Sequence, residues 1–354
     1  MSADPRLPKN PFSLPQRVTY NFFQVLDHFI SRRITIKLLG RLRYKAFLSA
    51  AESLKSKGEG RLIEVERREN LTEDEFKKYY VKNGIPVVLK GEANNWDCVR
   101  KWSPQYFKKV HGTDQVPVID STDLDKEIDY ISLADLIDAI DQGNNKAYFR
   151  FYNLLVQHPE HLEDFDINWL RSFRHKRQYF ESFQVFIGGA NSMTDIHNAH
   201  IANLFVQSYG RKEWVLYPNH YIPFIDPPST ENGIFRNAPA RVNGKAFNPF
   251  QPDYEAYPYF KYLNGYTTVL EPGDILYNPP FMWHAVRNLT DSIGVGFRWV
   301  NAWHSLKSSP VYYLLDLMAY RPNYFKSIRM VRENANKQFI HRLEKMRKNA
   351  NRKK

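Results

Sequence analysis

Two histidines stand in surroundings that suit them to metal chemistry. His197 follows a turn of small residues, GGANSMTDI, at the start of a run of β-forming residues. His284 follows EPGDILYNPPFMW, in which a Pro-Gly-Asp turn leads into a strand that a double proline ends. On neighbouring barrel strands the two could bind one ion, because neutral imidazole is the usual ligand for iron and similar metals. The other histidines are expected to be surface or packing residues.

The residue two positions after His197 decides what such a site can be. Side chains alternate along a strand, so positions 197 and 199 point to one side and position 200 to the other. The residue placed to reach a metal held by His197 is therefore Ala199 and not His200. Alanine has no atom that can act as a ligand.

The segments around these residues predict a β core between helical ends. From about residue 145 onward, short aromatic and β-branched runs such as SFQVFIGG and YTTVLEPGDILYNPP alternate with turns, which is typical of a closed or double-sheet β fold. Apolar residues at helical spacing precede this region, and helical patterning returns after it. We predict a flexible arm at 1–16, amphipathic helices at 17–60, a domain containing the β core at 61–302, and a helical segment with a basic tail at 303–354.

Composition limits the class of protein. The chain has 354 residues and one cysteine, Cys98, which excludes an intramolecular disulfide and fits a reducing compartment. No apolar run is long enough for a secretory signal or a transmembrane helix. We therefore expect a soluble, cytoplasmic protein.

The net charge of +12 is concentrated in two segments. Residues 326–354 carry eleven Lys or Arg against two Glu, and residues 31–45 carry six Lys or Arg and no acid. Contact with nucleic acid, acidic lipid or an acidic protein would use such segments. Because no nucleic-acid motif accompanies them, a solvated helix face and a frayed tail are the favoured interpretation.

Two longer stretches resemble the cupin-like JmjC group of Fe(II)/2-oxoglutarate oxygenases. They are TDIHNAHIANLFVQSYGRKEWVLYP and EPGDILYNPPFMWHAVRNLTDSIGVGFRWVN, with GIPVVLKGEANNWDCVRKWSPQYF similar to the entry into that domain. The resemblance implies a double-stranded β-helix, a relative of the jelly roll, with N- and C-terminal helices. It also implies iron, 2-oxoglutarate and O2 as cofactor and co-substrates.

The resemblance assigns roles to individual positions. His197 and His284 match the first and the distal iron ligands, and Lys212 matches the lysine that pairs with the far carboxylate of 2-oxoglutarate. Thr194 and Asn203 match polar positions that help hold the co-substrate. Independently of the resemblance, a dicarboxylate in a dry barrel needs a fixed cation, and a charge-assisted hydrogen bond is roughly twice as strong as a neutral one.

The sequence departs from the family pattern at two positions. Ala199 stands where the family has an acidic metal ligand, and Gly296 stands where it often has a polar side chain, which we expect to leave space. The same His-x-Ala pattern occurs in Fe(II)/2-oxoglutarate halogenases, where chloride or bromide fills the vacated coordination position. We therefore predict first a halogenase acting on an unactivated carbon. Hydroxylation, with water, substrate or a rearranged His200 completing the site, and a non-catalytic binding module are the alternatives.

Partners and substrate are less constrained. The C-terminal segment has an apolar first half, so a homodimer through these helices and packing of the segment on its own barrel are both open. A small-molecule or carrier-bound substrate is expected. Residues that could line the mouth of the site are Arg150, Tyr217, Asn278, Arg298 and Trp299.

Overall fold

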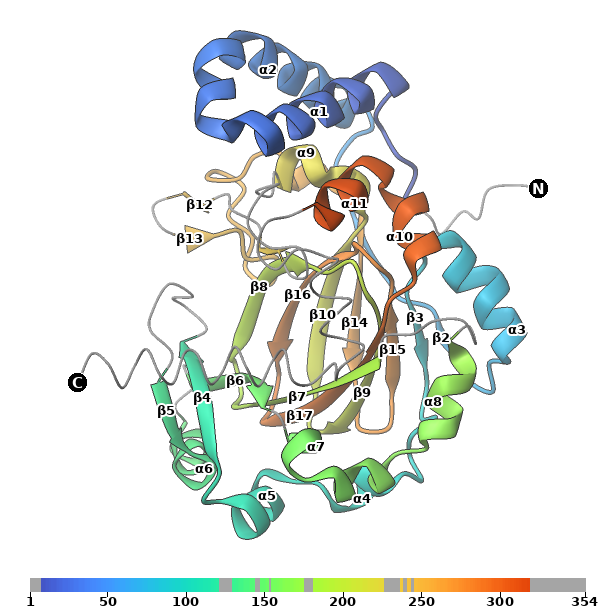
Figure 1. The fold of residues 1–354 in the computed structure, drawn as a ribbon, viewed down its shortest axis with the longest axis vertical. Helices are drawn as coiled ribbons and strands as arrows, with labels where there is room; N and C mark the ends of the chain where they lie inside the picture. The colour runs from blue at the N-terminus through green and yellow to red at the C-terminus, as the bar shows by residue number, and fades with distance from the viewer. Residues whose placement is uncertain are drawn as a thin grey trace.

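The computed structural model describes residues 8–120, 129–143, 147–152, 154–174, 181–225, 236–237, 241–242 and 245–318. Helices lie at both ends of a central β barrel (Figure 1). At one end, α1 (Leu14–Leu26), the π-helical turn η1 (Asp27–Ser31) and α2 (Arg32–Lys55) form a hairpin. A capping box between Ser13 and Gln16 starts α1 three residues before the predicted position 17, and α2 bends at Leu39, whose φ and ψ of −120° and 15° are not helical.

Eight strands form the barrel as two four-stranded sheets, and consecutive barrel strands lie in different sheets except β10 and β14, which pair with each other. One sheet has the order β8-β16-β10-β14, and the other has the order β7-β17-β9-β15. All neighbours within these two groups are antiparallel. The strands are β7 (Glu181–Gly188), β8 (Met193–Asn198), β9 (Ala202–Tyr209), β10 (Lys212–Tyr217), β14 (Gly265–Leu270), β15 (Ile275–Asn278), β16 (Trp283–Asn288) and β17 (Ser292–Trp299). This topology is a double-stranded β-helix, which confirms the predicted fold class.

Shorter strands extend both sheets, and short helices surround them. The added strands are β1 (Leu62–Glu64), β2 (Arg67–Arg68), β3 (Val87–Leu89), β4 (Gln115–Asp120), β5 (Asp129–Ser132), β6 (Ala147–Tyr152) and β11 (Arg236–Asn237), with β12 (Arg241–Val242) and β13 (Lys245–Ala246) as a separate pair. The helices are α3 (Glu73–Glu75), η2 (Phe76–Val81), α4 (Asp97–Lys101), α5 (Pro104–His111), α6 (Leu133–Asp141), α7 (Leu154–Gln157), η3 (Pro159–Asp164), α8 (Ile167–Phe173), η4 (Asn219–Tyr221), α9 (Ile222–Ile225), η5 (Phe260–Tyr262), α10 (Ala302–Ser308) and α11 (Pro310–Leu317).

Three apolar clusters hold these layers together. The largest joins the outer face of the β7-β17-β9-β15 sheet to the helices from η2 to α8. A second joins the outer face of the other sheet to the N-terminal hairpin, α9 and α11. The third fills part of the barrel interior with side chains from both sheets, including Phe205, Trp214, Leu276 and Val286. The polar side chains of the barrel interior are therefore placed beside a dry apolar layer.

The C-terminal helices pack on the barrel of the same chain. Tyr312 and Tyr313 of α11 are buried in the second cluster with Phe281 and Trp283. The described part of the apolar C-terminal segment is thus covered in part by its own barrel, whereas Trp303, Leu314 and Met318 are 77%, 49% and 42% exposed, and a homodimer stays a prediction. The predicted basic tail at 326–354 lies outside the described residues.

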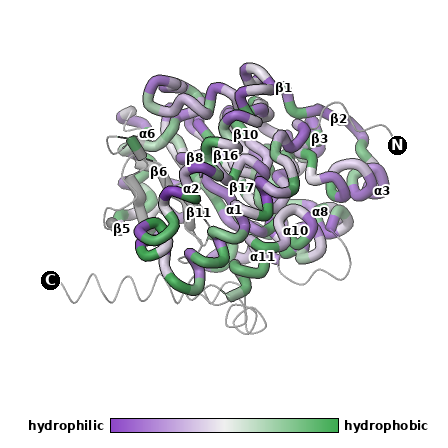
Figure 2. The backbone as a smooth tube through the Cα atoms, turned by 90° about the horizontal axis from the view of Figure 1, so that it is seen from above, coloured by the Kyte–Doolittle hydropathy of each residue, from purple (hydrophilic) through white to green (hydrophobic). Residues whose placement is uncertain are grey.

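The N-terminal hairpin exposes apolar side chains. Large apolar residues with at least 45% of their surface exposed include Phe22, Phe29, Ile34, Leu38 and Leu42. Hydrophobic and hydrophilic stretches lie next to one another along these helices in Figure 2. No helix within the described ranges has both the length and the apolar character needed to cross a bilayer.

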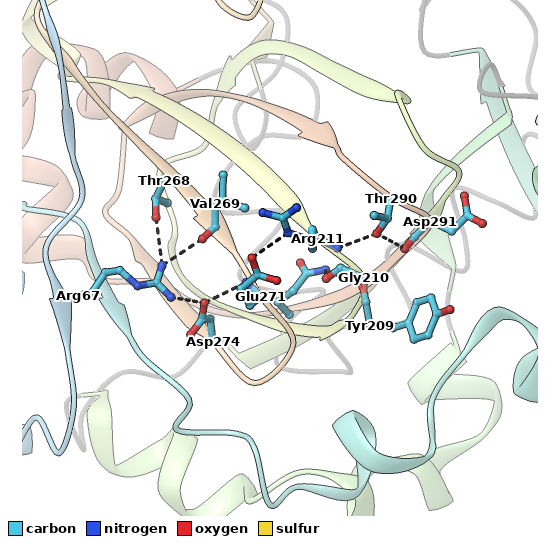
Figure 3. Close-up of polar contacts among 11 residues, drawn as sticks. Arg67, Tyr209, Gly210, Arg211, Thr268, Val269, Glu271, Asp274, Thr290 and Asp291 are labelled. Carbon is cyan, nitrogen blue, oxygen red and sulfur yellow. Dashed lines mark hydrogen bonds and ion pairs between the residues drawn. The ribbon is translucent and has the colours of Figure 1, made fainter.

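A buried aspartate organises the turn between β14 and β15 (Figure 3). The Asp274 carboxylate is 2% exposed and forms an ion pair with Arg67. It also accepts hydrogen bonds from the backbone N–H groups of Gly91, at 3.1 Å, and of Glu271, at 2.9 Å. One side chain therefore ties β2, the segment after β3 and this turn to one another.

We expect Asp274→Ala to lower the free energy of unfolding by about 3 kcal/mol, because it leaves a partly buried guanidinium and two N–H groups without their acceptor. Glu271→Ala, which removes an exposed ion pair with Arg211 in the same turn, should cost less than about 1 kcal/mol. Urea denaturation of both variants measures the difference. Equal losses would contradict a structural role for the buried carboxylate.

Candidate functional site

His197 and His284 are direct cross-strand partners. They face each other across the β8–β16 pairing, with ring centroids 4.1 Å apart. Each is 6% exposed. The structure thus brings together two residues that are 87 positions apart in the sequence, as the prediction of a shared ion requires. Their binding of a metal stays a prediction.

Backbone carbonyls orient both imidazole rings. His197 Nδ1 lies 2.8 Å from the carbonyl oxygen of Asp195, and His284 Nδ1 lies 2.9 Å from that of Met282. A carbonyl oxygen can only accept, so the shortest contact of each ring places a proton on Nδ1, and in the neutral ring Nε2 then keeps its lone pair. Metal-bound histidines show this arrangement, in which the outer hydrogen bond fixes the tautomer and the ring orientation. The side-chain amide of Asn278 lies beside the same atom of His284, with Nδ2 3.2 Å from Nδ1. Trp214 stacks on His284, with ring centroids 5.3 Å apart.

A β-bulge turns Thr194 to the same side as His197. His284 pairs with His197 and Val286 pairs with Thr194, so two residues of β8 lie opposite the single residue Ala285. Val286 belongs to the interior cluster, and cross-strand partners point to one face, so Thr194 also faces the interior. A regular strand would place residues 194 and 197 on opposite faces. The bulge therefore makes the predicted co-substrate role of Thr194 sterically reasonable.

Ala199 lies directly after β8, and the chain around it is held tightly. Its carbonyl oxygen accepts a hydrogen bond from the N–H of Phe281 at 2.7 Å. Phe281 has a φ of 61°, an unusual value for a bulky residue, in the loop that leads to His284. Such strain persists only where surrounding contacts enforce it, here with Phe281 buried against Tyr312.

His200 does not complete the pair. Its ring lies beside Tyr313 of α11, with centroids 6.4 Å apart, and its carbonyl oxygen accepts a hydrogen bond from Ser305. The alternative in which His200 serves as a third ligand would therefore need a rearrangement of the chain. Among the described residues, no group of three His, Cys, Asp or Glu side chains close enough to share an ion includes His197 or His284.

Lys212 is buried in the barrel on the same strand face as Trp214. Its side chain is 1% exposed, and its Nζ lies 5.4 Å from the ring centroid of Phe205 and 6.0 Å from that of Phe186. Phe205 contacts Trp214, and Trp214 stacks on His284, so aromatic rings connect the lysine to the histidine pair. Burial lowers the pKa of Lys212 to about 7. A buried amine with this pKa gains a proton readily when an anion binds beside it.

A row of polar side chains crosses the facing sheet. Asn278, Asn203 and Arg298 are successive cross-strand partners on β15, β9 and β17. The Oδ1 atoms of Asn278 and Asn203 are buried and accept no hydrogen bond from the described residues. Buried acceptors of this kind cost free energy unless a ligand or water supplies a donor. The predicted site residue Asn203 is therefore placed to contact a polar ligand.

The expectation that Gly296 leaves space is wrong. A Cβ atom at this position would lie 2.8 Å from Oδ1 of Asn203 and 3.2 Å from Nε of Arg298. The room that the missing side chain leaves is thus already used by two neighbouring polar side chains. Gly294 likewise makes room for Phe205, whose ring would lie 2.3 Å from an added Cβ.

The residues expected at the mouth separate into two groups. Asn278 and Arg298 belong to the interior polar row, whereas Tyr217 and Trp299 are packed in the second and first apolar clusters. The side chain of Arg150 lies outside the described residues. Sequence reasoning did not assign Trp214 to the site, although its position two residues after Lys212 on one strand was the available signal.

The fold and the histidine pair define a barrel protein of the double-stranded β-helix class, and comparison with known proteins identifies its family. A family model described as a cupin-like domain matches residues 73–309, more than half of the chain. The chain belongs to this family, in the JmjC group of Fe(II)/2-oxoglutarate oxygenases. The predicted resemblance is therefore confirmed.

Three relatives show the range of similarity. JmjC domain-containing protein F of Dictyostelium discoideum is 27% identical over 276 residues, covering 63% of this chain and 58% of its own. Lysine-specific demethylase 8 of Xenopus tropicalis is 27% identical over 231 residues, covering 64% and 50%. Bifunctional peptidase and (3S)-lysyl hydroxylase JMJD7 of Homo sapiens is 24% identical over 271 residues, covering 68% and 84%. The chain thus spans only 50% to 58% of the length of the first two relatives.

The donor set fits a divalent iron ion in part. His197 and His284 supply two oriented neutral imidazoles, a donor type that iron accepts, and Lys212 supplies a cation suited to a dicarboxylate. The remaining coordination positions would have to come from 2-oxoglutarate, water or another small ligand, because Ala199 contributes none.

We expect the affinity for 2-oxoglutarate to fall as pH rises above about 7. The ligand favours the ammonium form of Lys212, so above the pKa of the free protein, binding takes up a proton and Kd rises by up to about tenfold per pH unit. Below that pKa the affinity should be flat with pH. Calorimetric titration of the anaerobic Fe(II)-loaded protein between about pH 6.5 and about pH 9 measures this slope.

The Lys212→Met variant should bind 2-oxoglutarate weakly, and its Kd should not depend on pH above about 7. It should fold at least as stably as the wild type, because the substitution removes a buried amine. Lys90→Met, at an exposed lysine paired with Glu69, is the matched control and should retain both affinity and slope. A slope that survives in Lys212→Met would place the proton uptake elsewhere.

Proposed function

We propose that this protein is an Fe(II)- and 2-oxoglutarate-dependent oxidoreductase. The observation that carries the proposal is a pair of adjacent imidazoles whose Nδ1 atoms are hydrogen-bonded to backbone carbonyl oxygens. The pair lies in the same barrel interior as a buried lysine. A bound ferrous ion with 2-oxoglutarate supplies the capacity to activate O2 for attack on a C–H bond. His197 and His284 would hold that ion.

The chain's own residues have distinct tasks in this proposal. Lys212 holds the far carboxylate of the co-substrate through a charge-assisted hydrogen bond, and Thr194 and Asn203 offer polar contacts along its length. The apolar cluster around Phe205 and Trp214 excludes water, which strengthens these electrostatic contacts. The fixed backbone carbonyls at Asp195 and Met282 keep both rings in the orientation that binding needs.

Hydroxylation is the reaction we favour. The human relative is named a (3S)-lysyl hydroxylase, and other relatives are named lysine-specific demethylases. No relative named above is a halogenase, so the relatives favour hydroxylation over our first prediction from the sequence. The substrate stays a proposal at the level of a small or carrier-bound molecule.

Halogenation is the second candidate, and Ala199 is the specific observation that favours it. Two neutral imidazoles do not balance the charge of a ferrous ion, so a small anion such as chloride or bromide is attracted to the position that a carboxylate would otherwise occupy. Water in the same position would leave hydroxylation as the outcome. The two candidates therefore differ in a single ligand, and halide sensitivity separates them.

Anaerobic addition of Fe(II) and then 2-oxoglutarate should produce a visible charge-transfer band, and O2 should then release succinate. His284→Ala should abolish both. A chloride-dependent shift of the band would support halogenation, and a band insensitive to chloride would support hydroxylation. The absence of a band and of succinate in the wild type would overturn the proposal and favour a non-catalytic binding module.

Ala199→Asp should tighten Fe(II) binding by about tenfold or more, because it would restore a charged ligand at the position where the family has its acidic metal ligand. Any chloride sensitivity of the band should disappear in this variant. Ala199→Asn, which is similar in size but neutral, is the matched control. Chloride sensitivity that persists in Ala199→Asp would show that halide binds somewhere other than at this position.

A further inference from the structure

A second group of histidines lies outside the barrel. His111 ends α5, His158 immediately precedes η3, and His161 lies within η3. The rings of His111 and His158 stack with centroids 3.5 Å apart, and those of His111 and His161 meet edge to face at 5.1 Å. Such rings were expected to be isolated packing residues, but the fold gathers three of them.

Acidic side chains complete two candidate ligand sets that share His111. One set contains His111, Asp114 and His158, and the other contains His111, Glu160 and His161, with all ligand atoms of each set within 4.8 Å of one another. These are the groups with metal-binding spacing among the residues that the structure describes. Both belong to α5, η3 and their flanking turns, and neither includes a barrel histidine.

The orientation of His161 distinguishes the two sets. Its Nδ1 lies 2.9 Å from Oδ2 of Asp164, and the same oxygen accepts a hydrogen bond from Nε1 of Trp102 at 2.8 Å. The carboxylate fixes the proton on Nδ1, so the Nε2 lone pair of His161 points outward. A carboxylate behind a histidine in this way is the usual support of a metal-bound imidazole.

The Nε2 lone pair of His161 faces an imidazole nitrogen of His111. Nε2 of His161 lies 2.8 Å from Nε2 of His111. A proton on His111 can bridge them as a hydrogen bond, and a tetrahedral zinc ion at about 2.05 Å from each would need them about 3.3 Å apart. The two nitrogens therefore have to separate by only about 0.5 Å to admit an ion.

We propose that His111, His161 and Glu160 bind a divalent transition metal ion of the zinc class. Two imidazoles and one carboxylate suit zinc, cobalt or nickel and do not suit magnesium or calcium, which prefer oxygen ligands. Glu160 reaches the site from solvent, with 61% of its side chain exposed, and lies beside His158. The ion fastens α5 to η3, two elements about 50 positions apart. They also meet through ring contacts of His161 with Phe107 and Trp102, and their flanking residues His158 and Asp114 are hydrogen-bonded at 2.7 Å.

Metal titration of a His197→Ala/His284→Ala variant tests this site apart from the barrel centre. After treatment with a chelator, calorimetry should show one equivalent of Zn²⁺ bound, a rise in Tm and no binding of Mg²⁺. Co²⁺ should give a visible absorption spectrum typical of nitrogen and oxygen ligands. No Zn²⁺ binding in this background would overturn the proposal.

Variants of the ligands test the assignment. His111→Gln and His161→Gln should each remove the bound equivalent, and Glu160→Gln, an exposed change that should leave the fold intact, should weaken binding by about tenfold or more. His28→Gln, at a histidine that contacts Phe29 in the N-terminal hairpin, is the control and should bind as before. Full retention of Zn²⁺ by Glu160→Gln and His161→Gln would contradict this ligand set.

A different observation, in the N-terminal hairpin, carries a second inference. Ile34, Leu38 and Leu42 recur every four residues in α2 and are 47%, 73% and 53% exposed. The exposed basic residues of α2 follow the same spacing at Arg33, Lys37, Arg41 and Lys45. In α1, Leu14, Val18 and Phe22 are also exposed at four-residue intervals.

We infer that this hairpin binds the surface of an anionic phospholipid membrane. An interfacial helix buries apolar side chains at the acyl boundary, while Lys and Arg contact acidic headgroups. A nucleic acid would use the basic residues and leave the apolar ones in water. A second copy of the hairpin would bring two basic segments together. The hairpin lies at one end of the molecule, where a flat surface can reach it (Figure 1).

Co-sedimentation of the full chain with vesicles tests the membrane contact. The protein should pellet with vesicles of phosphatidylcholine containing phosphatidylglycerol, and much less with phosphatidylcholine alone or at high salt. Leu38→Ser/Leu42→Ser and Lys37→Gln/Arg41→Gln should each lose most of the binding. Val110→Ser and Lys90→Gln, exposed residues of the same types elsewhere, are the controls. Failure to pellet with acidic vesicles, or equal pelleting with neutral ones, would overturn this inference.

Discussion

The pairing of β8 with β16 is the constraint on which the candidate active site depends. It places His197 directly opposite His284, and the carbonyl oxygens of Asp195 and Met282 then fix both rings with Nε2 directed away from the backbone. Asp195 lies in the bulge of β8 and Met282 in the loop before β16, so the local backbone beside each histidine supplies the carbonyl that orients its ring. The two sheets and the apolar clusters around them serve largely to keep this pair in register.

Short β-forming runs between turn residues were enough to predict a closed or double-sheet β fold and to single out the two histidines, and the resemblance to the JmjC group supplied the double-stranded β-helix. They were not enough to predict that the Thr194 side chain points into the barrel. The bulge opposite Ala285 adds one residue to β8 and so reverses which side chains point inward, and a bulge has no distinct signature in the residue types. The consequence of Gly296 was also not predictable from its type. Whether a missing side chain leaves a void depends on cross-strand neighbours, and here Asn203 and Arg298 occupy the room.

The two histidine groups of this protein differ in the charge around them. The barrel pair combines neutral imidazoles with the buried amine of Lys212, so its interior attracts negatively charged ligands. The group on α5 and η3 contains the carboxylates of Asp114 and Glu160, and Asp164 is hydrogen-bonded to His161, so its negative charge favours a cation. The three histidines of the outer group are spread over 50 positions and lack a sequence motif, so only the fold reveals them. The barrel pair, in contrast, can be found in the sequence, because recognisable turns precede both His197 and His284.

Because β8 and β16 lie far apart along the chain, we expect their pairing to form before a metal ion can be bound by both histidines. Closing a loop of this length costs entropy before any contact across it is gained, and pairings between distant strands form slowly. A nascent chain that ends before β16 has only one of the two imidazoles and no centre to complete. An ion held by both rings would therefore stabilise only the finished barrel, and incorporation of the metal would follow assembly instead of guiding it.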